Sequence, residues 1–383
     1  MKAQTLEHIA GVLLVLFILA DVFLTVLYAR IGTGIISDHV AKWTWPLFRS
    51  VSKLAGGRRG TVLSFCGPVI LVVILFVWMI GLTCGMALII HPKLGTSVVM
   101  TGGATPTDFA TAVYLSGTAI STVGTSNFAP ATSAMRLFFV ANSLIGISVL
   151  TLSLTYILQI YSALRERNTL GLKLHVLTRE TGDAAELVAG LGPEGDFHSG
   201  YTLLIEAAAE LTALKEAHHF YPVLFYFRFR QPFYSVSHSA RLVLDAVTLI
   251  WTAIDQERYR WLSKSAAVSQ LHDAALLTMK ILEEAFVPGG KPSPDEGVDR
   301  AQVKHAWDRH YLASLHRLRA AGIETVSDFD AGAERYFEVR REWEPYVHKL
   351  GRSGAYDAHE TDPSTTPPSE EQERAKGDTH MGL

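Results

Sequence analysis

Three long apolar runs dominate the first half of the chain and restrict the folds that it can adopt. They cover residues 9–29, 62–90 and 131–164. A helix of about 20 apolar residues crosses the hydrocarbon core of a bilayer, so each run is long enough to span a membrane. The chain has a mean hydropathy of +0.21 but 19% charged residues, which suits a membrane domain followed by a soluble one. We therefore predict an all-α membrane protein with three transmembrane helices and a helical cytoplasmic domain.

The first apolar run carries a single charge, Asp21. This run is long for a cleaved signal peptide and lacks a small-x-small cleavage site, so we interpret it as a retained transmembrane helix. A lone charge in lipid is costly and is by default a functional hypothesis. For Asp21 we favour a polar contact with a neighbouring helix or subunit. No run carries spaced arginines, so a voltage sensor is not expected.

Basic residues concentrate in the linker between the first two runs. Residues 91–130 carry one Lys or Arg, whereas residues 30–60 carry six: Arg30, Lys42, Arg49, Lys53, Arg58 and Arg59. By the positive-inside rule we expect this linker and the C-terminal half to be cytoplasmic, with the N-terminus outside a multi-pass cell-membrane protein. Trp43 and Trp45 predict an interfacial, partly helical linker. Either a collar helix that meets the next span or a plain membrane-surface linker fits this pattern.

A short apolar segment between the second and third runs ends in a loop that contains Gly. Residues 106–108, Pro-Thr-Asp, are a helix-start signal, and Phe109–Ile120 predicts a helix of about three turns, too short to span. It leads into residues 121–130, Ser-Thr-Val-Gly-Thr-Ser-Asn-Phe-Ala-Pro. Lipid cannot satisfy the carbonyls of such a loop, so the loop must be buried in protein or line a watery path.

This loop resembles the selectivity filter of the potassium-channel family, whose motif is T-V-G-Y-G-D. Three residues match the motif: Thr122, Val123 and Gly124. Three others depart from it, in place of the Tyr, the second Gly and the Asp: Thr125, Ser126 and Asn127. Pro130 falls where many members of the family have Pro. The resemblance covers about residues 62–167 and leaves the first span and the C-terminal half outside it.

The resemblance implies a homotetramer, because one loop per chain cannot enclose an ion. It assigns ion binding to the filter residues Thr122, Val123, Gly124, Thr125 and Ser126, whose carbonyls replace water around permeant K⁺, with no other metal or cofactor. Gly124 suits a position where φ is positive. Thr125 is too small to replace the packing of the family's Tyr, and Ser126 adopts the angles of the second Gly only at a cost. We therefore expect an altered outer ion site and weakened K⁺/Na⁺ discrimination.

The third run carries two further candidate features. Gly146 lies where family members often have a Gly that lets the inner helix bend as a gating hinge; close helix packing is the equal alternative. Ser148, Thr151 and Thr155 are spaced to lie on one helix face. They either line the ion cavity or form interhelical hydrogen bonds.

The second half of the chain is predicted to be soluble and helical. Helix-period patterns cover residues 206–219, 236–262, 266–286, 298–321 and 326–350, and a Pro/Gly cluster at 287–294 divides them. Residues 351–383 have a composition typical of disorder. We thus divide the chain into an N-terminal transmembrane helix (1–30), an interfacial linker (31–61), a pore domain (62–165), a helical cytoplasmic domain (166–350) and a tail (351–383).

Several other motifs carry little functional signal. Residues 190–195 match G-x-G-x-x-G, but a helical pattern precedes them, so no nucleotide site is expected. The histidines at 218–219, 305, 310 and 316 are expected to be surface or packed residues, and Cys66 and Cys84 are too far apart along a helix to pair. The aromatic, basic segment 221–234 either contacts the membrane or another subunit or forms an amphipathic core. With 34 Lys+Arg against 37 Asp+Glu, a nucleic-acid partner is not expected.

Together these features predict a tetrameric cation channel that conducts K⁺ and is gated by the inner helix and the cytoplasmic domain, and not an enzyme. The alternative is a non-conducting, membrane-anchored signalling or scaffold protein with a degenerate pore fold. A membrane-bound enzyme is the third hypothesis, because the soluble half has no assigned role.

Overall fold

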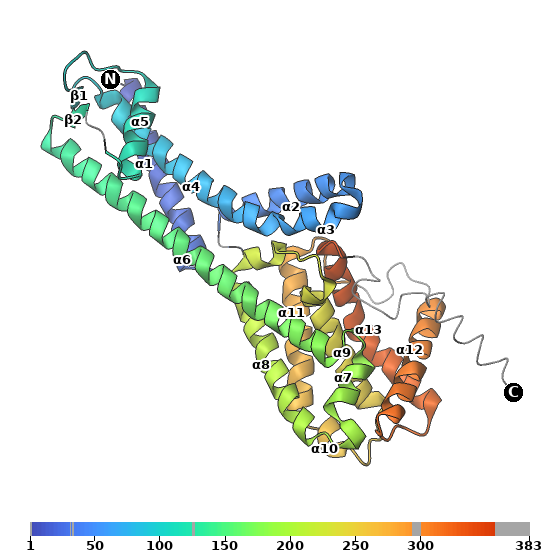
Figure 1. Ribbon diagram of the computed structural model, residues 1–383. Coiled ribbons are helices and arrows are strands. Elements are labelled where there is room, and N and C mark those ends of the chain that lie inside the picture. The colour runs from blue at the N-terminus through green and yellow to red at the C-terminus, as the bar shows by residue number, and fades with distance from the viewer. Residues whose placement is uncertain (1, 31, 33, 125–126, 293–299, 357–383) are drawn as a thin grey trace. The chain divides into compact units, whose positions relative to one another are not determined.

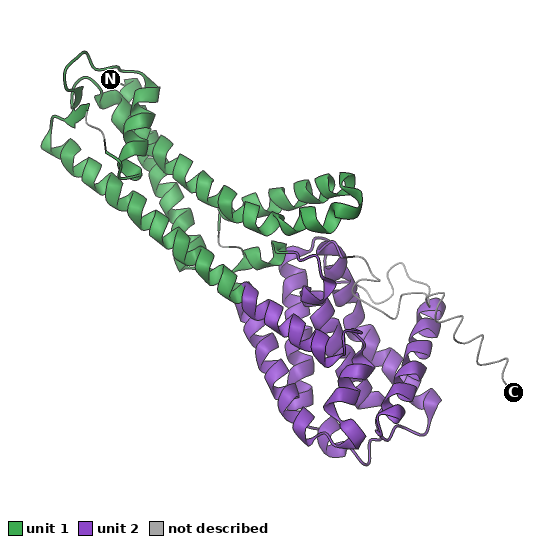
Figure 2. Cartoon of the chain, viewed as in Figure 1, with its two compact units in different colours: residues 1–163, 219–227 green, residues 164–218, 228–383 purple. Residues whose placement is uncertain are grey.

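The chain forms two compact units in a computed structural model that describes residues 2–30, 32, 34–124, 127–292 and 300–356 (Figure 2). Unit 1 comprises residues 1–163 and 219–227, and unit 2 comprises residues 164–218 and 228–383. Both units are mainly helical, which confirms the all-α prediction. Most of the predicted tail, residues 357–383, lies outside the described residues.

Among the described residues, three helices are long and apolar enough to cross a membrane; two lie in unit 1, and the third begins there and ends in unit 2. They are Lys2–Leu27, Cys66–Lys93 and Ser133–Leu177. The first consists of α1 (Lys2–Val22) and a π-helical turn (η1, Phe23–Leu27), the second of α4 (Cys66–Ile90) and a 3-10 turn (η3, His91–Lys93), and the third is α6 (Ser133–Leu177). The protein is therefore a membrane protein with three candidate spans, as predicted.

The helix boundaries differ from the predicted ones where polar residues continue a helix. The first helix begins seven residues before Ile9 and the third continues 13 residues past Leu164. The apolar run marks only the part of a helix that suits lipid, so good helix formers at its ends were missed. The second predicted helix is interrupted at Phe65, between α3 (Arg59–Ser64) and α4. Pro68 in the first turn of α4 fits this break because it has no N–H to donate to a preceding turn.

Small residues bring α1 and α4 into close contact, and the two helices run side by side (Figure 1). A Cβ on Gly11 would lie 2.6 Å from the carbonyl oxygen of Gly85, and a Cβ on Gly81 would lie 2.6 Å from Ile18. Membrane helices associate through such small residues because lipid supplies no hydrophobic driving force between them. The additional N-terminal helix is therefore packed tightly onto the second span.

The linker between α1 and α4 is mainly helical. It contains α2 (Ile36–Leu54), a 3-10 turn (η2, Gly56–Arg58) and α3. One face of α2 buries Ala41 and Trp45, while the opposite face exposes apolar side chains at helical spacing: Trp43, Leu47, Val51 and Leu54. This amphipathic pattern is what an interfacial helix requires.

Asp21 caps α2. Its Oδ1 accepts hydrogen bonds from the backbone N–H groups of Ile35 (2.6 Å) and Ile36 (2.8 Å), and its Oδ2 accepts one from Trp78 Nε1 (2.7 Å). The first N–H groups of a helix lack intrahelical partners, so a buried carboxylate there satisfies donors that would otherwise be orphaned. The polar contact expected for Asp21 is thus made within the same chain.

Residues 219–227 belong to unit 1, although the first two of them end α8 (His198–Phe220), whose other residues belong to unit 2. This segment contains a short 3-10 helix (η5, Pro222–Tyr226). Its aromatic rings pack on two helices of unit 1, α2 and α6, in pairs whose centroids are each 6.0 Å apart: Tyr221 with Tyr156, Tyr226 with Trp45 and Phe227 with Tyr161. The first part of the aromatic segment 221–234 is therefore a packed element of the membrane unit.

Unit 2 is a helical bundle around α9. Its elements are α7 (Ala184–Leu191), η4 (Pro193–Gly195), α8 (His198–Phe220), η6 (Pro232–Tyr234), α9 (Val236–Thr252), α10 (Arg260–Ser263), α11 (Ala266–Phe286), α12 (Arg300–Ala320) and α13 (Phe329–Ser353). All residues from Ser237 to Ile250 in α9 are buried, and α7, α11 and α13 pack on it. The predicted helix 236–262 was too long, because backbone pairing of Ile254 with Thr325 ends it. The short α7 is the helical pattern expected before the G-x-G-x-x-G match.

Buried charges link α9 to α12 and α13. Asp245 is fully buried, accepts hydrogen bonds from Tyr336 (2.6 Å) and His310 (3.1 Å), and lies 3.7 Å from Arg340. Burial alone would raise the pKa of Asp245, but the charges of Arg340, His310 and Arg241 outweigh burial and hold that pKa well below its ordinary value. His310 is thus a packed residue with a carboxylate partner.

Other motifs in unit 2 keep structural roles. The element before the G-x-G-x-x-G match is a helix, α7, rather than the strand that a nucleotide-binding turn requires. His218 is buried and its Nδ1 contacts the carbonyl of Leu214 at 2.9 Å. Among the described residues no group of three His, Cys, Asp or Glu side chains is arranged to hold a metal ion, and Cys66 and Cys84 are free thiols.

Candidate functional site

The short helix α5 (Phe109–Ile120) has the bounds predicted from sequence. Asp108 begins it as an N-cap, because its side chain accepts hydrogen bonds from the backbone N–H (2.9 Å) and the hydroxyl (2.8 Å) of Thr111. One face of α5 is buried against α4 and its surroundings: Ala112, Leu115, Ser116, Ala119 and Ile120. This helix is therefore fixed at its start by the cap and along its length by packing.

The filter-like loop folds back onto the end of α5. The N–H of Thr122 donates to the carbonyl of Ala119 and the N–H of Gly124 to the carbonyl of Thr118, each at 3.2 Å. Thr122 has a φ of 60° and Gly124 a φ of 72°. The positive φ of Gly124 is the conformation predicted for it. Thr122 adopts the same region with a Cβ, which costs about 1 kcal/mol and is common at functional sites.

The loop is exposed in the single chain. Residues 121–124 are all exposed, and the side chain of Val123 is 79% exposed. Thr125 and Ser126, the two remaining predicted filter residues, lie outside the described residues. The described part of the loop thus presents backbone and small side chains that the chain itself does not cover.

A two-stranded ribbon holds the exit of the loop. Strand β2 (Phe128–Pro130) pairs antiparallel with β1 (Val98–Met100), with Val98 opposite Pro130. The N–H of Thr101 donates to the carbonyl of Asn127 at 2.9 Å, which extends the ribbon to the edge of the loop. The loop is therefore held between a capped helix and a ribbon.

The inner helix α6 braces the base of the loop. Ser143 Oγ donates to the carbonyl of Ala119 at 2.9 Å, and a Cβ on Gly146 would lie 2.4 Å from the carbonyl oxygen of Ile120. Gly146 therefore permits close approach of α6 to the end of α5. The helix is continuous through Gly146.

The predicted cavity-lining residues share an exposed face of α6. Ser148, Thr151 and Thr155 are exposed, and Thr155 Oγ1 donates back to the carbonyl of Thr151 at 3.0 Å. None of the hydrogen bonds described for these hydroxyls joins α6 to another helix. This face is available to line a cavity in an assembly.

Residues 69–163 match a family model described as "Ion channel", and this segment contains α4, α5, the loop and the first two thirds of α6. Residues 69–163 are therefore similar to ion channels. The potassium-channel-like arrangement of a pore helix and a filter loop between two spanning helices is the one that the sequence predicts. This segment lies within the pore domain predicted at residues 62–165.

The chain is also similar to another membrane protein, over a longer stretch. The chain is 26% identical over 249 residues to the uncharacterized membrane protein YdjJ of Bacillus subtilis (strain 168), which covers 65% of this chain and 71% of YdjJ. The 95 residues of 69–163 are fewer than these 249, so the similarity extends beyond the pore domain. No solved structure matches the chain significantly.

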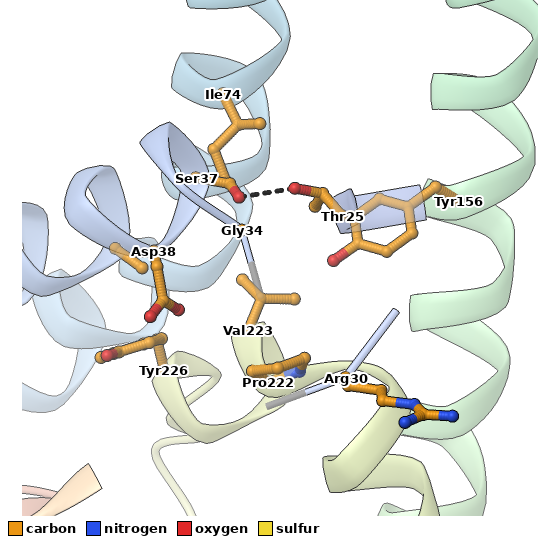
Figure 3. Close-up of a pocket in the computed structure, with 11 residues that line it drawn as sticks. Thr25, Arg30, Gly34, Ser37, Asp38, Ile74, Tyr156, Pro222, Val223 and Tyr226 are labelled. Atoms are coloured by element: carbon orange, nitrogen blue, oxygen red, sulfur yellow. Dashed lines mark hydrogen bonds between the residues drawn. The ribbon is translucent and has the colours of Figure 1, made fainter. Parts of the chain in front are cut away.

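A cavity lies in unit 1 beside α6, where η1, α2, α4 and η5 meet (Figure 3). Tyr156 of α6 points its ring into this space, opposite Pro222 and Val223, and the Thr25 hydroxyl pairs with that of Ser37 at 2.7 Å. Asp38 and Tyr226 close another side. The segment 219–227 thus contacts the inner helix of the pore domain directly, which the sequence did not indicate.

Sequence reasoning also missed residues that position the site from a distance. The bond from Ser143 to the Ala119 carbonyl has no local sequence signal. The sequence analysis does not name Trp78, although its indole N–H donates a hydrogen bond to the buried carboxylate of Asp21. Both are single polar groups in apolar helices, which is the feature that can draw attention to such residues.

Proposed function

We propose that the protein is a homotetrameric cation channel in which four copies of the loop 121–127 surround one ion path. The observation that carries this proposal is the loop itself. Thr122 and Gly124 take left-handed backbone angles at the end of a capped helix, within a segment similar to ion channels. Small residues and carbonyls in this position can replace the water around a cation.

The exposed loop supports assembly into a ring. A non-helical backbone between spanning helices is tolerated only where protein covers it or water reaches it. The chain leaves residues 121–124 exposed, and further copies would cover them and place their carbonyls around a common axis. The C-terminal end of α5, with its partial negative charge, favours a cation below the loop.

The inner helix supplies the remaining parts of the proposed pore. Ser148, Thr151 and Thr155 line the cavity on the exposed face of α6. Gly146 acts as the gating hinge, and bending there changes the contact of α6 with Ile120 at the base of the loop. The segment 219–227 links the helical domain to α6 and transmits its state to the gate.

K⁺ is the proposed main permeant ion, with reduced discrimination against Na⁺. Thr122 to Gly124 keep the inner half of the filter motif, whereas Thr125 and Ser126 depart from it. The loop faces the outside and the helical domain the cytoplasm, because the basic linker 30–60 is retained on the cytoplasmic side. The protein acts without catalysis.

Two measurements test this proposal. The mass of the detergent-solubilised protein is expected to be that of a tetramer, four times 42.0 kDa, or about 168 kDa. A dimer contradicts the proposal because two loops cannot close a ring.

Purified protein in a planar bilayer is expected to give single-channel currents in symmetric KCl. A folded tetramer that passes no current across varied voltage and pH supports a non-conducting scaffold instead.

A further inference from the structure

His91 lies at the point where three segments of unit 1 meet. It follows α4 in η3, and its Nδ1 is 2.6 Å from Oε1 of Glu7 on α1. Its Nε2 is 3.1 Å from the carbonyl oxygen of Thr107, the residue before the cap of α5. Its ring meets the edge of the Phe109 ring at a centroid distance of 5.7 Å. One side chain therefore connects α1, the end of α4 and the start of the pore helix.

Both hydrogen-bond partners of the His91 ring are acceptors. A backbone carbonyl has no proton to donate, and neither has an ionised carboxylate. A neutral imidazole carries one N–H, so it can complete only one of the two contacts. The two bonds together require two protons. One lies between Nδ1 and Oε1 of Glu7 and can reside on either atom, and the other resides on Nε2. The contacts are therefore complete only when the site holds one proton more than a neutral His91 and a carboxylate carry.

Other titratable groups near His91 and Glu7 do not take part in these two hydrogen bonds. The other charged or imidazole groups on the segments packed against His91 are Lys2, His8 and Asp21 on α1, Lys93 in η3 and Asp108 at the start of α5; Asp21 is bound by Trp78 and the start of α2. The Asp108 side chain accepts a hydrogen bond from Thr111, and Lys93 is exposed. The side chains of His91 and Glu7 are 28% and 25% exposed, so protons reach them while water competes only partly for their bonds.

We infer that His91, Glu7 and the Thr107 carbonyl form a binding site for one proton, which fastens the start of the pore helix. Because both bonds need this additional proton, the site is filled in acid and loses the proton as pH rises. The other end of α5 is held by Ser143, and its 12 residues span about 18 Å. Release of one end therefore changes the support of the loop. This effect on conduction rests on the proposed function; the proton site does not.

Unfolding of the full-length protein tests the proton site without any current. The thermal midpoints of wild type and His91→Gln are compared from pH 5 to pH 8. The bound proton stabilises the folded state, so the advantage of the wild type should be larger at pH 5 and decline as pH rises, by on the order of 3 °C. His39→Gln, in the exposed part of α2, should show a constant difference. A constant difference for His91→Gln as well would overturn the proton site.

Glu7→Gln provides a second variant in case His91→Gln does not fold. It keeps an oxygen that accepts from Nδ1 but removes the negative charge, so the pH-dependent part of the midpoint should move to lower pH. An unchanged profile would contradict the site.

Potassium flux from vesicles then tests the coupling. Wild-type flux should change between pH 5.5 and pH 7.5 on the side that the loop faces, by a factor of about five or more. The flux of His91→Gln should not depend on pH in this range, whereas His39→Gln should follow the wild type. Equal pH responses in wild type and His91→Gln would overturn the coupling. Absence of flux in every variant contradicts the proposed function and leaves the unfolding profiles to decide the proton site.

Discussion

Trp78 donates a hydrogen bond of 2.7 Å from its indole nitrogen to Asp21, and both side chains are buried. The carboxylate of Asp21 also accepts hydrogen bonds from the N–H groups of Ile35 and Ile36, where α2 begins. One charge in the first span therefore joins α1, α2 and α4. It serves as a structural junction of the membrane unit.

Replacement of Asp21 is expected to destabilise this junction strongly. Asp21→Ala removes the acceptor of the buried Trp78 N–H, which costs about 1–3 kcal/mol, and of the half-buried N–H groups of Ile35 and Ile36, which cost less because water can reach them. We expect a loss of about 2–4 kcal/mol in the free energy of unfolding, measured by thermal or denaturant unfolding in detergent. Asp38→Asn in the first turn of α2 is the control, because its partner Lys42 is exposed and the pair contributes about 0.5 kcal/mol or less. Equal effects of both substitutions would contradict the junction.

Gly146→Ala is expected to disturb the contact between the inner helix and the pore helix. The added Cβ would lie 2.4 Å from the carbonyl oxygen of Ile120, so one helix must shift. Overpacking of this kind costs about 1–3 kcal/mol. The channel should open less readily, as measured by open probability. Gly117→Ala in α5 is the matched control, since its Cβ would meet only Thr83 at 3.7 Å and a helical Gly→Ala change stabilises by up to about 1 kcal/mol. Normal opening of Gly146→Ala would contradict both proposed roles of this glycine.

Acid is expected to weaken unit 2 through His218. Burial lowers the pKa of His218 to about 4, and the charge of Arg167 adds to this effect, while the bond to the Leu214 carbonyl opposes it. In the unfolded chain the imidazole takes up a proton near pH 6.5. Between these values the unfolded state binds the proton and the folded state does not. Stability is therefore lost as pH falls from about 6.5 to about 4, by roughly 3 kcal/mol.

The variant His218→Leu should lose this pH dependence. Urea unfolding at several pH values should show a flatter profile than the wild type over the same window. His219→Leu, at the neighbouring position, should keep the wild-type slope. A wild-type slope in the His218 variant would show that other groups control the acid sensitivity.

Ion selectivity is expected to depend on positions 125 and 126. The double change Thr125→Tyr with Ser126→Gly restores the family motif at the outer part of the filter, so K⁺/Na⁺ discrimination should rise. Reversal potentials under K⁺/Na⁺ gradients measure this ratio. Strong K⁺ selectivity of the wild type, unchanged by the substitutions, would contradict the expectation of a weakened outer site.

Local signals were sufficient to predict α5 and the conformation of Gly124. The cap at Asp108 and its partner Thr111 lie three residues apart, and φ at Gly124 follows from the chemistry of one residue. The fold class followed from the length of the apolar runs, because a bilayer allows few alternatives. These are features that a short window of sequence contains.

Contacts between distant residues were not predictable in this way. Asp21 and Trp78 are 57 positions apart, and Glu7 and His91 are 84 positions apart. Nothing in the residues around Glu7 or Trp78 indicates its partner, because the pairing depends on how α1 and α4 align. The docking of residues 219–227 within unit 1 likewise depends on the tertiary fold. The helix ends of α1 and α6 were missed because hydropathy marks lipid contact rather than helicity.

The conductance of two matched glycine variants tests the proposed pore most directly. Gly124 and Gly56 both have positive φ, 72° and 51°, and a Cβ at either would meet no atom within 4 Å. Alanine at each position therefore causes a similar local strain, but only Gly124 lies in the proposed filter. In planar bilayers we expect Gly124→Ala tetramers to lose or strongly reduce the single-channel current and Gly56→Ala tetramers to conduct as the wild type. Wild-type conductance and selectivity in Gly124→Ala would contradict conduction through this loop.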